Sequence, residues 1–287
     1  MFYKLYKKRG QSSFFAIKKF AKNNNINKIG HCGTLDPEAE GLLIVATDED
    51  TKALSLIENQ NKEYYVEAKF HYSSDSFDLG TYVTKIQNFQ IITKSQIIQA
   101  LEILKKQTKQ VPPIYSAKKI NGTRAYKLAR DNKEFSLKAN DIKINNLELI
   151  EFNEVNQSII IKANVSKGTY IRSLIHDLAN ICNTDAVVVV LKRIKIGNIC
   201  LNGQEEFEKI TNLNELFNVK LFKLTKNDIQ ILANENSNSC YFESLKNFCG
   251  NIIFIYLNNI VGWGKSEFGN VTIFKRFFKR LTMLISS

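Results

Sequence analysis

Proline is scarce in this chain of 287 residues, and its three prolines stand at two places, Pro37 and the pair Pro112-Pro113. Long hydrophobic runs are lacking too: a run such as Ala186–Leu191 is far too short to span a bilayer, which argues against a membrane-spanning helix. The five cysteines form no Cys-x-x-Cys pair and have no zinc-site spacing with the three histidines. We therefore expect free thiols in a reducing compartment and no structural metal.

The N-terminus lacks the apolar segment of a secretory signal peptide. Its basic, acid-free composition is also found in mitochondrial transit peptides, but recognisable motifs begin as early as Lys7. We expect a cytoplasmic location. The length suits one large domain, or a large domain with a small one, and a hydrophobic fraction of 44% is normal for a folded protein.

Acidic residues are missing from two stretches, which makes the formal net charge of +12 uneven along the chain. Residues 1–28 and residues 105–130 each contain eight lysines and arginines and no acid. Clustered basic blocks on a basic chain favour a polyanionic partner, most simply nucleic acid. Solvated lysines on helix faces are the alternative explanation for either block.

One glycine-framed loop, Gly30–Gly41 with the sequence GHCGTLDPEAEG, carries the strongest sign of chemistry. Pro37 removes a backbone donor and keeps Asp36 out of the right-handed helical region. The apolar run Leu42–Ala46 that follows predicts a buried strand. A carboxylate fixed on a bend beside a core strand is a candidate catalytic group. The Asp-Pro-Glu-Ala segment is also a good helix start, and both interpretations can hold together.

Periodicity and capping signals predict an α+β fold with a mixed sheet, because strands and helices mix without strict alternation. Ser12-Ser13 is expected to cap a helix with Phe14, Ile17, Phe20 and Ala21 on one face, and Thr93–Gln96 reads as a capping box. The expected helices are residues 12–23, 50–59, 93–106 and 169–182, and the expected strands are residues 42–47, 64–70, 141–152, 157–166 and 187–191.

Beyond about residue 215 the pattern changes to short strands at 252–257, 261–265 and 271–274, separated by asparagine and glycine. We interpret residues 220–280 as a small all-β unit. The tail at 274–281 mixes basic and aromatic residues. A last strand with a charged edge, a nucleic-acid contact and a membrane-surface helix are the three interpretations of it.

Two further segments look functional. Residues 110–130 contain a rigid Pro-Pro segment, then alternating basic and aromatic residues, then a basic helix; such side chains neutralise phosphates and stack on unpaired bases, although a surface loop with a solvated helix is equally compatible. In the segment Ser166–Arg172, Gly168 permits a strand-to-helix turn, Thr169 can cap the helix, and Arg172 projects from its first turn. An arginine beside Asp36 would keep that carboxylate ionised, whereas a structural ion pair is the plainer alternative.

These segments, together with residues 61–64 (NKEY) and 191–193 (LKR), resemble the TruB family of tRNA pseudouridine synthases in order and spacing over about residues 7–200. The resemblance implies isomerisation of the uridine at position 55 in the T-loop of tRNAs to pseudouridine. It implies a catalytic domain at 1–215 with a pseudouridine-synthase-like mixed sheet, flanking helices and an RNA-binding insertion at about 105–135. It also implies a small β-rich, PUA-like RNA-binding domain at 216–287.

The resemblance assigns roles residue by residue. Asp36 matches the nucleophile, Tyr64 the tyrosine that stacks on the target base, and Arg172 the arginine that pairs with the nucleophile. The positions expected to contact the substrate are His31, Tyr64, Tyr170, Leu191 and Lys7. From the basic block of the insertion, the residues expected to bind RNA are Lys118, Lys119, Arg124, Lys127 and Arg130.

The implied partner is the T-arm stem-loop of tRNA, with no membrane, no obligate protein partner, a monomeric state, no cofactor and no metal. The chain departs from the family pattern at Lys8, where proline is expected, and at Cys32, where threonine is usual. A tRNA-binding or RNA-folding module without catalysis is the alternative function, since the same basic surfaces would serve it.

Overall fold

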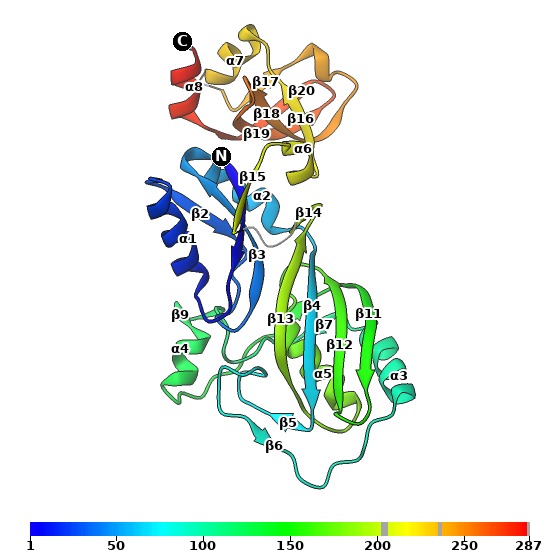
Figure 1. Ribbon diagram of the computed structural model, residues 1–287. Coiled ribbons are helices and arrows are strands. Elements are labelled where there is room, and N and C mark those ends of the chain that lie inside the picture. The colour runs from blue at the N-terminus through cyan, green and yellow to red at the C-terminus, as the bar shows by residue number, and fades with distance from the viewer. Residues whose placement is uncertain (202–205, 235–236, 286–287) are drawn as a thin grey trace.

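The structure, a computed structural model, describes residues 1–201, 206–234 and 237–285. Within these residues nine strands form a mixed sheet, which confirms the predicted α+β class (Figure 1). The main path of the sheet runs β11 (Ile144–Asn153), β12 (Ser158–Val165), β4 (Lys62–Phe70), β13 (Ala186–Ile196), β3 (Glu40–Thr47), β1 (Phe2–Lys7) and β15 (Phe207–Ile210). Two strands pair beside this path, β2 (Ile29–Cys32) with β3 and β14 (Ile199–Cys200) with β13.

The central pair β13 and β3 is parallel, whereas β4 and β1 lie antiparallel on either side of it. In this register Arg193 of β13 lies beside Gly41, the glycine that ends the loop Gly30–Gly41. We call this loop, which carries Asp36, the acidic loop. The expected strand at 42–46 is confirmed, and β3 is buried along nearly all of its length, because it lies in the middle of the sheet. The sheet thus anchors the loop that carries Asp36.

Three helices pack with the sheet into one hydrophobic core: α1 (Ser13–Asn23), α3 (Lys94–Leu104) and α5 (Ile171–Ile181). The capping box at Thr93 is confirmed, and the Ser12 side chain caps α1 as predicted. The predicted face of α1 is wrong at Phe14, which is 63% exposed, because the buried face turns through Ala16 instead.

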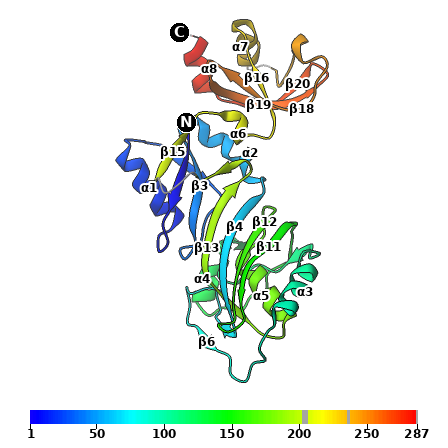
Figure 2. The ribbon, with the colours of Figure 1, turned by 45° about the vertical axis from the view of Figure 1, so that its right-hand side comes forward.

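The predicted helix at 50–59 is a 3-10 turn, η1 (Asp48–Ala53), followed by the short α2 (Leu54–Glu58). Both join a second core that also contains residues of β3 and of the C-terminal region, among them Leu42 and Phe277. This second core therefore joins the sheet domain to the C-terminal region, which lies above the sheet domain in Figure 2.

The basic insertion is built from short elements. Strands β7 (Lys109–Gln110) and β10 (Asn140–Asp141) pair at its base, and β8 (Lys119–Ile120) and β9 (Thr123–Arg124) form a hairpin that leads into the basic helix α4 (Ala125–Arg130). A separate two-stranded ribbon, β5 (Tyr72–Ser73) with β6 (Thr84–Lys85), lies at the lower edge in Figure 1.

The C-terminal region forms a second sheet, in the order β16 (Lys220–Lys223), β18 (Cys249–Tyr256), β19 (Asn259–Glu267), β20 (Asn270–Arg276) and β17 (Ser239–Tyr241). The three predicted strands are confirmed. The region is strand-rich but not all-β, because α6 (Leu213–Leu216), α7 (Lys226–Ala233), the turn η2 (Glu243–Leu245) and α8 (Phe278–Ile285) accompany the sheet. The sequence pattern of this region is dominated by strand signals, so the all-β interpretation did not include α7 and α8.

The basic, aromatic tail has an internal role. Arg276 is buried and donates to the backbone oxygens of Leu232 and Ser237, while the Nη1 of Arg280 lies 2.6 Å from the carboxylate of Asp50 in η1. These two arginines therefore hold the C-terminal region together and fasten it to the sheet domain. Across the described ranges, no helix combines the length and apolar character that a bilayer crossing demands.

Candidate active site

Asp36 lies in an irregular loop between β2 and β3, not in a helix. Only one turn-like hydrogen bond forms there, from the N–H of Ala39 to the oxygen of Asp36 at 3.1 Å, among the contacts described for this loop. The backbone of Gly41 has a φ of +107°, and a Cβ there would overlap the backbone of Arg193. The helix-start interpretation of this segment is thus wrong, because the required glycine conformation and strand pairing follow at once.

Two buried cationic side chains, Lys7 and Arg193, hold this loop through hydrogen bonds to its backbone oxygens. The ammonium group of Lys7, in β1, donates to the backbone oxygens of Lys8, Pro37 and Ala39. The guanidinium group of Arg193 donates to the oxygens of Gly33 and Leu42, both at 2.8 Å. Burial lowers the pKa of Lys7 to about 8, against the nearby negative charge of Asp36.

The expected substrate contact of Lys7 is not visible in this geometry, because the side chain is fully buried beneath the loop and is not among the residues that line the pocket. Arg193 was present in the LKR motif, but no sequence signal linked it to Gly33. Both residues position the loop by binding its carbonyl groups.

Arg172 meets Asp36 as expected from the sequence. Its Nη2 lies 2.9 Å from the Asp36 carboxylate and 2.9 Å from the oxygen of Tyr115, and its Nη1 donates to the oxygen of Ser76 at 2.7 Å. A second carboxylate, Asp78, lies 3.5 Å from Nε. No role was assigned to Asp78 from the sequence, in which it lies two residues after the segment Ser74–Ser76.

Burial raises the pKa of Asp36, the nearby positive charge of Arg172 opposes this rise, and the negative charge of Asp78 adds to it. The expectation from the sequence was that the arginine keeps the carboxylate ionised, but it did not include the rise in pKa that burial itself causes. The Asp36 side chain keeps 38% of its exposure, because it faces an open pocket. The site therefore holds a carboxylate whose charge is costly yet accessible to a ligand.

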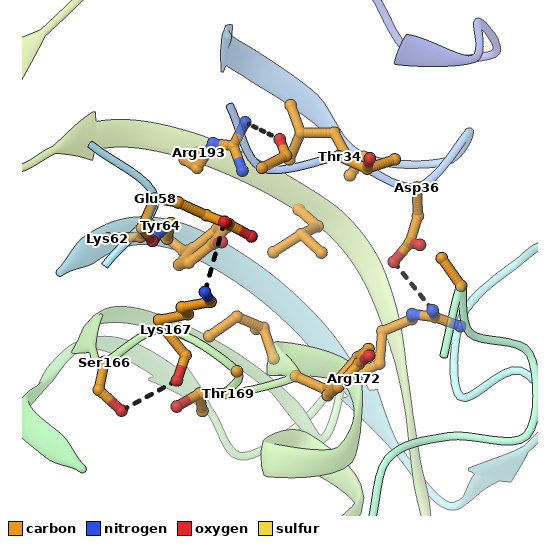
Figure 3. A pocket seen from close by; sticks show the side chains of 18 of the residues that line it. Thr34, Asp36, Glu58, Lys62, Tyr64, Ser166, Lys167, Thr169, Arg172 and Arg193 are labelled. Atoms are coloured by element: carbon orange, nitrogen blue, oxygen red, sulfur yellow. Dashed lines mark hydrogen bonds and ion pairs between the residues drawn. The ribbon is translucent and has the colours of Figure 1, made fainter. Parts of the chain in front are cut away.

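The pocket beside Asp36 has a volume of about 350 Å³, and its walls include Tyr64, Tyr170, Leu191 and Arg172 (Figure 3). Tyr64 on β4 and Leu191 on β13 come from adjacent strands, so the sheet fixes their spacing. A volume of this order is within the range of small-ligand sites. Four of the predicted site residues thus surround one cavity together with Asp36.

The start of α5 differs from the prediction, because Tyr170 and not Thr169 is its N-cap residue. Tyr170 precedes α5 directly, and its N–H donates to the Oε1 of Gln110 at 2.8 Å. The predicted cap, Thr169, is wrong, because its hydroxyl is buried without a hydrogen-bond partner among the described residues. Burial raises the pKa of the Tyr170 phenol, so this group stays protonated at neutral pH.

His31 lies beside the pocket instead of in its wall. Its Nε2 is 3.2 Å from the hydroxyl of Thr34, which does line the pocket. Burial lowers the pKa of His31, and the positive charge of Arg193 lowers it further, so the imidazole is neutral near pH 7.

Three further charged residues line the pocket and were not assigned a role from sequence: Glu58, Lys62 and Lys167. Lys167 lies 3.4 Å from Glu58, across the pocket in Figure 3, and also donates to the side chain of Asn59 at 3.1 Å. Lys62 donates to the oxygens of Glu58 and Gln60, and burial lowers its pKa to about 8. Lys62 lies in the motif at residues 61–64 and Lys167 in the segment Ser166–Arg172, so membership of these motifs could have marked both as candidate site residues.

The five basic residues of the insertion divide into two groups. Lys118 lines the pocket and donates to Lys138 and Asn140, and Arg124 donates to the oxygen of Ala117, so both also hold the insertion together. Lys119 and Lys127 are exposed, and Arg130 is exposed beside the ring of Tyr126.

The five cysteines, all within the described ranges, are free thiols, as expected. Among the residues that the structure describes, no group of histidine, cysteine and acidic side chains has the geometry of a metal site.

The mixed sheet thus presents an acid–arginine pair in a tyrosine-lined pocket. The model of the TruB family pseudouridylate synthase, N-terminal domain, matches residues 18–171. The chain is 39% identical over 262 residues to tRNA pseudouridine synthase B of Mycoplasma mobile, covering 91% of this chain and 89% of that protein. It is 38% identical over 285 residues to the protein of the same name from Mycoplasmopsis pulmonis, covering 98% and 96%. The chain therefore belongs to the TruB family of pseudouridylate synthases, which are isomerases.

Solved structures share the fold at low sequence identity. A Cbf5–Nop10–Gar1 complex matches with a TM-score of 0.69 and 19% identity, covering 96% of this chain and 84% of that one. An archaeal box H/ACA Nop10–Cbf5 complex matches with a TM-score of 0.66 and 16% identity, covering 96% and 85%. These matches confirm the fold.

Proposed function

We propose that this chain converts the uridine at position 55 in the T-loop of tRNAs to pseudouridine, with Asp36 as the nucleophile. The observation that carries the proposal is the accessible carboxylate of Asp36, 2.9 Å from Arg172, at a pocket walled by Tyr64 and Tyr170. Relatives named tRNA pseudouridine synthase B over nearly the whole chain support tRNA as the substrate.

The isomerisation breaks the bond between N1 and C1′ and forms one between C5 and C1′. The base must detach, turn and rejoin, so a temporary partner for the opened bond is needed, and an ionised carboxylate serves that purpose. Attack at C1′, attack at C6 and proton removal at C2′ all need Asp36 in its charged form. Arg172 favours that form against the cost of burial.

The target base must leave the RNA stack to reach Asp36. Tyr64 would stack on it and assist proton transfer, while Tyr170 and Leu191 would bound its pocket. His31 would contact the nucleotide from the rim. Lys7 would act beneath the loop as a positioning residue, given the three carbonyl groups that it binds.

The five basic residues of the insertion would contact phosphates of the T-arm stem-loop. They are Lys118, Lys119, Arg124, Lys127 and Arg130. The reaction involves no net redox change, so the proposal includes no cofactor and no metal. We further propose that a monomer suffices and that no membrane or obligate protein partner takes part. Residues 1–215 would form the catalytic domain, and residues 216–287 would act as a PUA-like RNA-binding domain. The protein would act in the cytoplasm.

The test is pseudouridine formation on a T-arm stem-loop by the unmodified protein and by Asp36→Asn. We expect the variant to bind the RNA within about twofold of the unmodified protein and to form no pseudouridine, because the amide is no nucleophile. Asp141→Asn, an exposed carboxylate on β10, is the matched control and should be fully active.

Turnover by Asp36→Asn would end the assignment of the nucleophile. RNA binding without any isomerisation by the unmodified protein would instead support the non-catalytic RNA-folding alternative.

A further inference from the structure

A second cleft, of about 660 Å³, lies between the sheet domain and the C-terminal sheet. One wall is the segment Asn59–Asn61 after α2 together with the turn after β13. The opposite wall includes Trp263 and Phe274 of the C-terminal sheet and Asn251 at its edge. Its volume is within the range of ligand-binding cavities, and no residue of the proposed catalytic set lines it.

The lining of this cleft has an unusual chemistry. Asparagine and glutamine side chains dominate its polar surface, and three aromatic rings share the apolar surface with aliphatic side chains. The described lining residues include the cation Lys195 but no carboxylate. Amides both donate and accept hydrogen bonds, as the edges of nucleobases do, and aromatic rings stack on base faces. A single lysine without a neighbouring acid suits a phosphate.

The amide side chains that line the cleft differ in their exposure. The Oε1 of Gln60 is buried and accepts no hydrogen bond from the described residues, although Nε2 of the same side chain donates to the oxygen of Leu216 at 2.8 Å. This Oε1 has no exposed surface and lies against Gly197, so a ligand in the cleft does not reach it. The side chains of Asn61 and Asn251, in contrast, are exposed, and their amides are the groups open to an occupant.

The cleft and the active-site pocket are both lined by residues of one segment, 58–62. Glu58 and Lys62 line the pocket, whereas Asn59, Gln60 and Asn61 between them line the cleft. Lys167 stands between the two cavities, since it forms an ion pair with Glu58 (Figure 3) and also donates to the side chain of Asn59. An RNA strand that delivers a base to Asp36 therefore passes close to the cleft.

We propose that this cleft binds one unpaired nucleotide of the substrate RNA, outside the nucleotide that reacts. Its base stacks against Trp263 or Phe274, its edge bonds to Asn61 and Asn251, and Lys195 contacts a phosphate. The identity of the occupant rests on the proposed function, because RNA is the polymer that the neighbouring pocket would receive.

Trp263 is the single tryptophan of the chain, so its fluorescence reports on this cleft alone. We expect full-length tRNA, titrated into the whole protein, to quench that fluorescence saturably, because stacked bases quench indole emission. Asn61→Ala with Asn251→Ala should weaken the quenching transition about tenfold, and Phe274→Ala should do the same through lost stacking. Asn270→Ala, an exposed amide on the same sheet but outside the cleft, is the matched control and should bind normally.

In steady-state kinetics the cleft variants should raise KM and leave kcat unchanged, since they touch no reacting atom. Unaltered fluorescence at RNA concentrations that saturate isomerisation would overturn the proposal, and so would equal quenching by the double variant. The two proposals fail separately: quenching that persists in a protein without isomerase activity refutes the catalytic assignment alone, while activity without quenching refutes the cleft alone.

Discussion

Replacing Arg172 by lysine keeps the positive charge but removes the planar guanidinium group and its several hydrogen bonds. The guanidinium contacts four groups at once: the carboxylates of Asp36 and Asp78 and the backbone oxygens of Ser76 and Tyr115. An ammonium group is a point charge on a flexible stem and cannot reach all four. Ser76 and Tyr115 belong to segments far from Asp36 in the chain, so the arginine also fixes those segments relative to the carboxylate.

The size of the effect follows from these contacts. Each backbone oxygen that loses its buried donor costs about 1–3 kcal/mol of folding stability. Displacement of Asp36 by about 1 Å costs about 10²-fold in rate, and loss of a preorganised charge contact costs about 10²–10³-fold. We therefore expect kcat of Arg172→Lys to fall at least 10²-fold, while the affinity for tRNA changes by less than about twofold, because the side chain is buried away from the phosphate path.

Single-turnover pseudouridine formation at saturating enzyme measures the rate, and filter binding measures the affinity. Thermal unfolding shows whether the variant is folded. Arg9→Lys is the control, since Arg9 forms an exposed ion pair with Glu38 of the same loop, and exposed pairs contribute little. A variant Arg172→Lys with more than about a third of the normal rate would refute the idea that guanidinium geometry positions Asp36.

Three other outcomes are expected. Gly41→Ala should lower the free energy of unfolding by about 2 kcal/mol or more in a denaturant titration, because of its positive φ and the overlap with Arg193; unchanged stability would contradict that geometry. The single-turnover rate should fall on acidification with a midpoint above the ordinary carboxyl pKa of 3.8, because burial raises the pKa of Asp36 and only its charged form reacts; a midpoint at or below 3.8 would contradict this. Lys119→Gln and Lys127→Gln should each weaken tRNA binding and reduce the salt dependence of log Kd by about one; unchanged slopes would remove these residues from the interface.

Sequence reasoning was accurate where the determinants are local. The capping box at Thr93, the buried strand after the acidic loop and the hairpin of β11 and β12 each depend on patterns within a dozen residues, and each is confirmed. The pairing of Arg172 with Asp36 came from the family resemblance, and the structure brings the two together. Helix α7 was not predicted, and α8 was raised only as the membrane-surface-helix interpretation of the tail, because each helix has only eight residues, too few to show a clear helical periodicity.

Contacts that depend on tertiary packing could not be read from the sequence. Thr169 has the right residue type for a cap, but Gln110, sixty residues earlier, supplies the hydrogen bond to the start of α5 instead. Asp78 became a partner of Arg172 through the path of the chain after β4, which no local pattern specifies. The rise in the pKa of Asp36 was not predicted either, because it depends on how the pocket walls and Asp78 pack around the carboxylate.

The register of three strands explains why Lys7 and Arg193 both hold the acidic loop. Gly41 of β3 pairs with Lys7 of β1 on one side and with Arg193 of β13 on the other, so the two cations flank the end of the loop in a single row across the sheet. A slip of one residue in either strand would turn the cation to the opposite face of the sheet and release the loop carbonyls. The position of Asp36 is therefore set by strand pairing between residues 7, 41 and 193, which are far apart in the chain, and any change that shifts this register should abolish the site while leaving the catalytic side chains themselves intact.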